Sequence, residues 1–274
     1  MLAKGSFKKG YWFHADRGDW CWCRWRCLRA ALAKAGSDVT FVARGDHLAA
    51  MHRHGLTLMS PRGDLHLNPV KATDVPASIG EVDFVLFCVK LWDVESAGAA
   101  IRPIVGPNTA VIPLQNGIDA SDRLIPILGK EAVMGEVAQI SATIAEPGVI
   151  RQTGTFMRLV FGELDGRPSQ RGAAFQSLCE AAKFEAVNSN SVLTALWEKF
   201  VLLATNSSVA ALTRLPFGKL RDDPEVLALF EKEWPRLPPW VAHAALRWPR
   251  SWRPRPCRQR AIFPRKCCPQ WRWI

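Results

Sequence analysis

Short apolar runs rich in β-branched and aromatic residues alternate with helical stretches through the middle of the chain. This alternation limits the possible folds more than any other feature. The run at 82–89 is almost continuously apolar, as expected for a strand in a parallel sheet that helices cover on both faces. Similar runs lie at 39–43 and 109–114, with helical stretches between the runs. The pattern predicts an α/β fold with a doubly wound parallel sheet.

The pattern changes in the second half of the chain. Residues 148–162 alternate and contain glycines, which predicts antiparallel strands near the sheet edge. Residues 169–182 and 191–212 are helical in pattern. We therefore expect a Rossmann-like dinucleotide-binding domain over 1–187, followed by a smaller, mostly α-helical domain over 188–274 for substrate binding and dimerisation.

Three polar side chains follow successive predicted strands: Arg44, Lys90 and Asn116. In open α/β sheets, ligands bind at the carboxyl ends of the strands. Arg44 stands where dinucleotide-binding folds often have an acid for the ribose hydroxyl, and a cation there favours NADPH, which has a 2′-phosphate. Each of the three could instead be a solvated residue at a strand end, but their succession favours a ligand site.

The net charge of +11 is concentrated at the two ends of the chain. Residues 1–29 and 234–274 carry seventeen Lys or Arg against two acids, so the rest of the chain carries a net charge of −4. The same ends hold ten of the twelve Trp and six of the eight Cys. The basic residues follow no helical or strand period, which argues against nucleic-acid binding.

The cysteines predict no metal site, because the clusters at the two ends lack paired C-x₂₋₄-C spacings. Cys88 and Cys179 are expected to be small buried side chains in a reducing compartment. No apolar run reaches the roughly 18 residues of a membrane span. Asp16 and Asp19 fall where a secretory signal would have its apolar core. We therefore expect a cytoplasmic protein with no membrane partner.

Residues 30–230 resemble the ketopantoate reductase (2-dehydropantoate 2-reductase) family. This family reduces ketopantoate, a 2-oxo acid, to pantoate with NADPH, in the biosynthesis of pantothenate and coenzyme A. The resemblance rests on four segments in the family's order and spacing: FVARG at 41–45, CVKLW at 88–92, LQNG at 114–117 and LWEKF at 196–200.

The resemblance implies that Lys199 is the catalytic residue. Lys90 and Asn116 would then lie between the nicotinamide and the substrate, and Arg44 would contact the adenosine phosphate. A lysine suits this role because hydride addition builds negative charge on the carbonyl oxygen, which an ammonium group can stabilise and protonate. Without the family, Lys199 would be interpreted as a surface lysine.

The chain departs from the family at the substrate contacts. The family often places Asn four and eight residues after the lysine, where this chain has Leu203 and Ser207. Ser207 is the candidate substrate contact, and Asn206 could compensate for the missing amides. The departure leaves open a second hypothesis, an NADP-dependent reductase of another 2-oxo acid. Either enzyme could be a homodimer.

The glycine fingerprint G-x-G-x-x-G of dinucleotide-binding folds is missing. In its place stand Trp20, Trp22 and Trp25. Tryptophan has the single codon TGG, and reading it one base later always gives a glycine codon. The three tryptophans therefore become Gly-x-Gly-x-x-Gly in the shifted frame. We interpret the N-terminal segment as frame-shifted.

The C-terminal segment permits the same interpretation. Under a two-base shift, residues 269–274 can read Ser-Met-Ala-Val-Asp, which resembles the family's substrate-contacting Ser-Met-x-x-Asp segment. We therefore treat 1–29 and 234–274 as aberrant and expect impaired activity in the chain as written. If both ends are genuine, the alternative is a non-catalytic basic binding protein.

Overall fold

The computed structural model describes residues 9–13, 26–215, 219–220 and 224–225. The chain divides into two compact units, Met1–Leu193 and Thr194–Ile274. Most of residues 1–29 and 234–274, which the sequence analysis interprets as aberrant, lies outside the described residues, but 9–13 and 26–29 are described.

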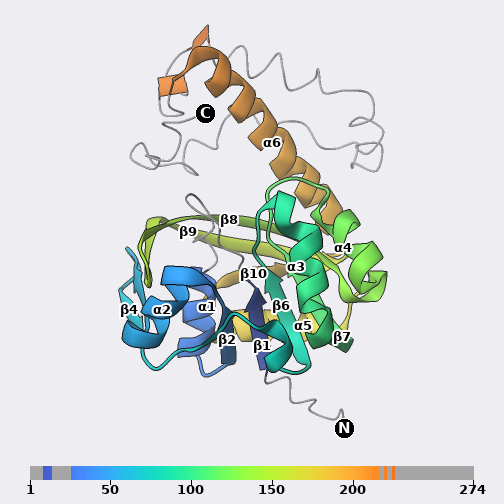
Figure 1. Cartoon of the computed structure of the whole chain (residues 1–274). Helices are drawn as coiled ribbons and strands as arrows, with labels where there is room; N and C mark the ends of the chain where they lie inside the picture. Colours follow the sequence, from blue (N-terminus) through green and yellow to red (C-terminus); the bar gives the residue numbers. More distant parts are fainter. Residues whose placement is uncertain (1–8, 14–25, 216–218, 221–223, 226–274) are drawn as a thin grey trace. The chain divides into compact units, whose positions relative to one another are not determined.

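The first unit contains a five-stranded parallel sheet in the order β5-β2-β1-β6-β7, which confirms the predicted α/β class (Figure 1). Its strands are β1 (Lys9–Phe13), β2 (Asp38–Val42), β5 (Lys71–Thr73), β6 (Val82–Phe87) and β7 (Val105–Pro113).

Both faces of this sheet are buried, and β6 shows why its sequence is almost continuously apolar. Phe84 and Leu86 join one hydrophobic core, while Val85 and Phe87 join a second core on the opposite face. All four side chains are at most 2% exposed. Because side chains alternate across a strand, a strand with two covered faces has little room for polar residues, and the charged residue of β6, Asp83, lies near its start.

The second sheet has the order β10-β9-β3-β4, and β8 also pairs with β9. Its strands are β3 (Leu56–Met59), β4 (Leu65–Leu67), β8 (Met134–Glu146), β9 (Val149–Glu163) and β10 (Glu185–Asn188).

The prediction of several antiparallel strands near the parallel-sheet edge over 148–162 is wrong in its arrangement. The segment is one strand of the second sheet, β9, and its antiparallel partner is the preceding β8. The glycines were misleading because they do not all mark turns. A Cβ on Gly162 would lie 2.1 Å from the carbonyl oxygen of Ser189, so this glycine permits two backbone segments to approach closely.

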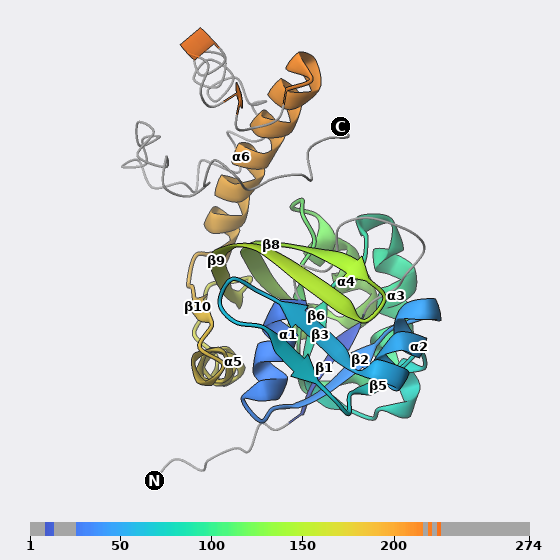
Figure 2. The same ribbon diagram turned by 90° about the vertical axis from the view of Figure 1, so that its left-hand side faces the viewer.

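The helices are α1 (Arg26–Lys34), α2 (Gly45–His54), α3 (Val94–Ile101), α4 (Ala120–Leu128), α5 (Gln170–Ala181) and α6 (Val192–Thr213), with 3₁₀ turns η2 (Pro76–Ser78), η3 (Leu91–Asp93), η4 (Arg102–Ile104) and η5 (Lys130–Ala132). The helices α1 and α5 share a core with both sheets, whereas α3 and α4 cover the other face of the parallel sheet (Figures 1 and 2). The side chain of Ser169 caps α5 by accepting a 3.0 Å hydrogen bond from the amide of Gly172.

A half-buried ion pair connects β9 to α5. The guanidinium of Arg171 donates to both carboxylate oxygens of Glu163, at 2.8 and 2.7 Å, and to the carbonyl oxygens of Thr109 and Glu131. Burial raises the pKa of Glu163, but the hydrogen bonds from Arg171 and Ser169 and the charge of Arg171 outweigh it, so the pKa is lowered. Arg171 therefore braces the second sheet against β7 and η5.

Cys88 and Cys179 are free and buried, as the sequence predicted. Burial raises the pKa of the Cys179 thiol to about 12. That thiol is therefore protonated at neutral pH and is a poor nucleophile.

Candidate functional site at the carboxyl edge of the parallel sheet

Arg44, Lys90 and Asn116 lie at one edge of the parallel sheet, where β2, β6 and β7 end. The ends of the strands are aligned, because Phe87 of β6 pairs with both Phe13 of β1 and Pro113 of β7. Neighbouring strands are about 4.8 Å apart. Lys90 and Asn116 therefore follow adjacent strands, and Arg44 follows a strand about 10 Å from β6, with β1 between them. These three residues are called the carboxyl edge below.

Arg44 occupies the N-cap position of α2 in an extended conformation, with φ −137° and ψ 165°. The next residue, Gly45, has φ +57°, a left-handed conformation that glycine adopts without strain. The Arg44 side chain is exposed, and its guanidinium has no hydrogen-bond partner among the described residues. It is therefore available to bind a phosphate group, as a guanidinium does through paired hydrogen bonds.

Lys90 begins the short turn η3 after β6. Its ammonium lies 5.4 Å from the ring centroid of Trp92, within the range of a cation–π contact. The Trp92 side chain is 74% exposed, so this contact leaves the carboxyl edge accessible to solvent.

Gln115 is a positioning residue that sequence reasoning missed. Its side chain is buried, and its amide nitrogen donates to the carbonyl oxygens of Phe87 and Val89, at 3.0 and 3.1 Å. These bonds fix the chain just before Lys90 and hold the exposed Asn116 beside it. The available signal was the segment LQNG, in which a polar residue directly follows the apolar end of β7.

Lys199 lies on α6 and is half-buried. Two residues of the same segment flank it, Trp197 and Phe200, whose rings meet edge to face at 5.8 Å. Lys199 belongs to the unit Thr194–Ile274, whereas the carboxyl edge belongs to Met1–Leu193. The structure therefore brings Arg44, Lys90 and Asn116 together at one edge of the sheet. Lys199 lies on α6, in the other unit.

Around the axis of α6, Asn206 projects in a direction closer to that of Lys199 than Ser207 does. At 100° per residue, a position seven residues on is rotated by about 20° from Lys199, and one eight residues on by about 80°. Asn206 is buried, and its Oδ1 atom has no hydrogen-bond partner among the described residues. A buried amide oxygen without a donor is costly, so a ligand hydroxyl or amide would stabilise it. The predicted substrate contact Ser207 is half-buried.

The residues that would replace the glycine fingerprint, Trp20, Trp22 and Trp25, lie outside the described residues. Within the described part of the chain, no group of His, Cys, Asp and Glu could hold a metal ion. No described helix is long and apolar enough to cross a membrane.

Comparison with known proteins gives a consistent result. The model of the family described as "Ketopantoate reductase PanE/ApbA" matches residues 26–166. The 2-dehydropantoate 2-reductase of Mesorhizobium japonicum is 27% identical over 207 residues, covering 68% of this chain and 63% of that protein. The uncharacterized oxidoreductase YkpB of Bacillus subtilis is 25% identical, covering 69% of this chain and 62% of that protein.

A solved structure supports the same assignment. The PanE/ApbA family ketopantoate reductase from Ralstonia eutropha JMP134 is 30% identical, with a TM-score of 0.71 over 87% of this chain and 79% of that chain. The chain spans less than two thirds of the length of the curated relatives named above.

Proposed function

The chain belongs to the ketopantoate reductase PanE/ApbA family, and on that premise we propose that it is an NADPH-dependent reductase that converts 2-dehydropantoate to pantoate. The observation that carries the proposal is the carboxyl edge, where a free guanidinium, an ammonium and an amide follow three aligned parallel strands. Bound NADPH would supply the hydride. The remaining chemistry belongs to the side chains of this protein.

Arg44 fits a nucleotide that has a 2′-phosphate. Its guanidinium is exposed, has no partner among the described residues and follows the strand next to β1. An acid at this position would instead accept hydrogen bonds from the ribose hydroxyls of NADH. We therefore assign to Arg44 the choice of NADPH over NADH.

Lys90 and Asn116 fit the carboxylate of a 2-oxo acid. A carboxylate accepts charge-assisted hydrogen bonds from ammonium and amide donors. The hydrogen bonds of Gln115 to the end of β6 keep both donors at the same strand edge.

Lys199 would act on the carbonyl oxygen. The oxygen gains negative charge as the carbonyl carbon is reduced, and the ammonium of Lys199 would stabilise this charge and donate the proton that completes the new hydroxyl group. Asn206, on the same side of α6, would accept a hydrogen bond from a substrate hydroxyl through its unpaired Oδ1 atom. Ser207 is the alternative contact.

The test compares two proteins: the chain as written, and the frame-restored protein encoded once the reading frame is corrected at both ends. We expect the frame-restored protein to oxidise NADPH when 2-dehydropantoate is added, with a higher kcat/KM for this substrate than for other 2-oxo acids. If it binds NADPH but turns over none of the acids, the assignment of the reaction is wrong.

A second candidate substrate class rests on Leu203 and Ser207, which replace the amides that the family often has. An apolar side chain at 203 favours a 2-oxo acid with an apolar body and fewer hydroxyl groups. If such an acid gives the higher kcat/KM in the same panel, the second assignment replaces the first. A homodimer of the frame-restored protein is a further proposal, which sedimentation equilibrium tests.

A further inference from the structure

A cavity lies at the carboxyl end of α1, away from the carboxyl edge. It has a volume of about 360 Å³ and lies between the end of α1, the β3–β4 hairpin, β9 and the end of α5. The last residues of α1 lead into the amino end of β2, whereas Arg44 follows its carboxyl end. The five residues of β2 separate the two sites by on the order of 15 Å. We call this cavity the α1–hairpin pocket.

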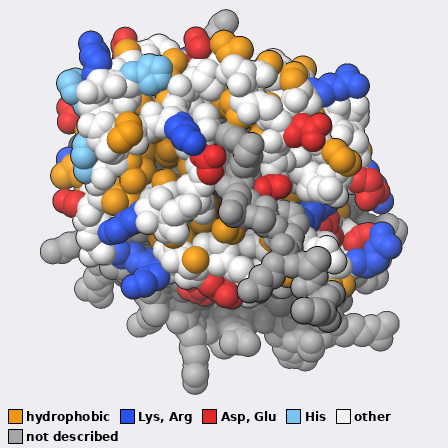
Figure 3. All heavy atoms as spheres, turned by 90° about the horizontal axis from the view of Figure 1, so that it is seen from below, with side chains coloured by type: hydrophobic (Ala, Val, Ile, Leu, Met, Phe, Trp, Pro, Cys, Tyr) orange, Lys and Arg blue, Asp and Glu red, His pale blue; other side chains and the backbone are white. Residues whose placement is uncertain are grey.

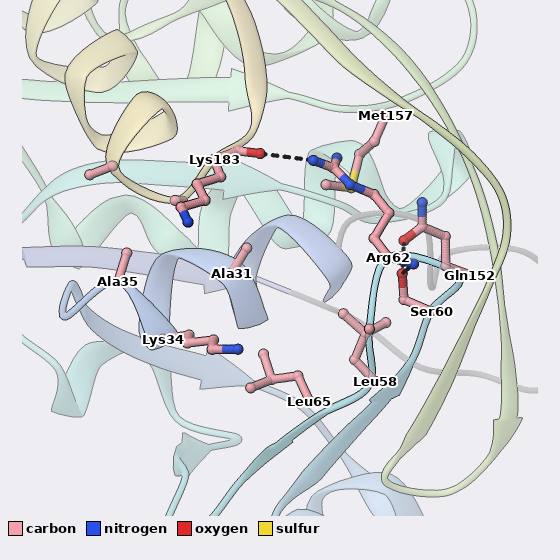
Figure 4. A pocket seen from close by; sticks show the side chains of 13 residues that line it. Ala31, Lys34, Ala35, Leu58, Ser60, Arg62, Leu65, Gln152, Met157 and Lys183 are labelled. Atoms are coloured by element: carbon pink, nitrogen blue, oxygen red, sulfur yellow. Dashed lines mark hydrogen bonds between the residues drawn. The ribbon is translucent and has the colours of Figure 1, made fainter.

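The pocket combines an apolar floor with a cationic rim. The floor includes Leu58, Leu65 and Met157, and the charged residues that line the pocket are Lys34, Arg62 and Lys183, with no Asp or Glu among the lining residues. Figure 4 shows that these three cations come from three elements far apart in the sequence. Seen from below, the described surface has hydrophobic side chains in a hollow between Lys and Arg side chains (Figure 3).

The acids nearest in sequence to these cations are engaged elsewhere. Their partners are Lys71 for Asp38, the amide of Ser60 for Asp64, Gln176 for Glu180 and Arg158 for Glu185. Lys34 and Lys183 therefore have no ion-pair partner in the described part of the chain. The positive charges of these side chains therefore favour an anionic ligand.

The wall of the pocket is fixed by hydrogen bonds. Ser60 donates to the buried side chain of Gln152 at 2.8 Å, and the amide of Arg62 donates to the Ser60 hydroxyl at 3.1 Å. The guanidinium of Arg62 then reaches across to the carbonyl oxygen of Lys183, also at 3.1 Å (Figure 4). The hairpin and the end of α5 are thus tied together around the pocket.

The backbone conformation of Lys183 fixes the place of this residue at the end of α5. Lys183 has φ +54° and ends α5 at the position where helices usually have glycine, with the amide of Phe184 donating to the carbonyl of Cys179. A lysine in this left-handed conformation is strained. The bond from Arg62 holds it there, among the residues that line the pocket.

We propose that the α1–hairpin pocket binds a small organic anion with an apolar body, such as a short-chain carboxylate or an alkyl phosphate. The anionic group would bind at the rim between Lys34, Arg62 and Lys183. The apolar body would lie on the floor formed by Leu58 and Leu65. The pocket does not overlap the carboxyl edge, so the two sites would bind their ligands independently.

The test is calorimetric titration of the full chain, as written, with hexyl phosphate at constant ionic strength. Inorganic phosphate and hexanol serve as comparison ligands, because each offers only one half of the recognised chemistry. We expect hexyl phosphate to bind at least about tenfold more tightly than either. No binding of hexyl phosphate, or equal binding of inorganic phosphate or hexanol, would overturn the proposal.

Lys183→Gly locates the bound anion, because it removes the ammonium and leaves a residue suited to a positive φ. We expect it to weaken hexyl phosphate binding about five- to tenfold without lowering the melting temperature. The matched control is Lys130→Ala, an exposed lysine outside the pocket. Lys34→Ala tests the same rim should Lys183→Gly fail to fold. If neither rim variant weakens binding, or if Arg44→Ala does so instead, the anion binds elsewhere and the proposal is wrong.

Discussion

The carboxyl edge and the α1–hairpin pocket both present three polar or cationic groups, but they are held in different ways. At the carboxyl edge, each group follows its own strand, and the guanidinium of Arg44 is exposed and has no hydrogen-bond partner among the described residues. Around the pocket, hydrogen bonds join the hairpin, β9 and the end of α5 into a continuous wall.

This difference shows which site is complete within the first unit. The pocket is lined only by described residues of Met1–Leu193. The proposed reductase site needs two further parts, the phosphate-binding loop at 20–25 and the lysine on α6. Changes in those parts should therefore abolish the chemistry at the carboxyl edge and leave anion binding in the pocket intact.

The largest expected effect is the loss of reductase activity in the chain as written. A dinucleotide-binding loop brings backbone amides close to the pyrophosphate, and the indoles of Trp20, Trp22 and Trp25 would fill that space. We expect no measurable NADPH oxidation from the chain as written and clear activity from the frame-restored protein. Titration of the chain as written with NADPH, followed by fluorescence, is the direct measurement. Micromolar binding together with turnover would contradict the frame-shift interpretation.

Lys199→Ala in the frame-restored protein should lower kcat by about 10²-fold or more, the usual effect of losing a positioned acid. The Kd for NADPH should change little, because its proposed contacts lie in the first unit. Lys219→Ala is the control, since Lys219 is an exposed lysine in the same unit. An unchanged kcat in Lys199→Ala would remove this residue from the mechanism.

Arg171→Leu should destabilise the first unit by about 2 kcal/mol, because it leaves the half-buried Glu163 carboxylate without its cation. Both sites should then be lost together in thermal unfolding, in contrast to the selective loss expected for the other changes. Arg167→Leu is a matched control, since the Arg167 side chain is 83% exposed in its own ion pair. A stable Arg171→Leu protein would show that this ion pair does not brace the sheets.

The same ion pair predicts a pH dependence. The pKa of Glu163 is lower in the folded protein than its ordinary value of 4.5. A lowered pKa contributes stability above the unfolded-state pKa, and this contribution is lost as the pH falls through the folded-state value. Urea denaturation between pH 7 and 3 should show a loss of stability below about pH 4.5 that is smaller in Arg171→Leu. Parallel curves for the two proteins would contradict the prediction.

The contrast between the two sites also explains how much the sequence could predict. The sequence could predict that Arg44, Lys90 and Asn116 form a site, because each follows an apolar strand and the carboxyl ends of parallel strands share one edge. The α/β class followed for the same reason, since β6 has no polar face.

The pocket was not predictable from the pattern. Arg62 and Lys183 are 121 residues apart and meet only because the hairpin and α5 both pack near the end of α1. Neither residue belongs to a motif, and Lys183 breaks a local preference by occupying a position that favours glycine. The second sheet was missed for a related reason, because Gly162 permits a close backbone approach within a segment that the sequence predicts to be antiparallel strands near the sheet edge.

Arg44→Ala in the frame-restored protein should weaken NADPH binding about tenfold, which is the loss of one charge-assisted contact to a phosphate. NADH binding should change by less than about twofold, since NADH has no 2′-phosphate. Arg53→Ala is the control, because it removes another exposed arginine of the same region. Equal affinities for NADPH and NADH before mutation would end the argument for Arg44.

The smallest expected effect is that of Lys183→Gly on NADPH binding in the frame-restored protein. Two unit charges on the order of 15 Å apart interact in water by about 0.3 kcal/mol before screening. The Debye length of about 8 Å at physiological ionic strength reduces this further, so the Kd should change by less than about 1.5-fold. Because coupling between two binding sites is reciprocal, saturation with hexyl phosphate should leave the Kd for NADPH equally unchanged. A coupling of threefold or more, persisting at high salt, would show that α1 transmits binding between its ends and that the two sites are not independent.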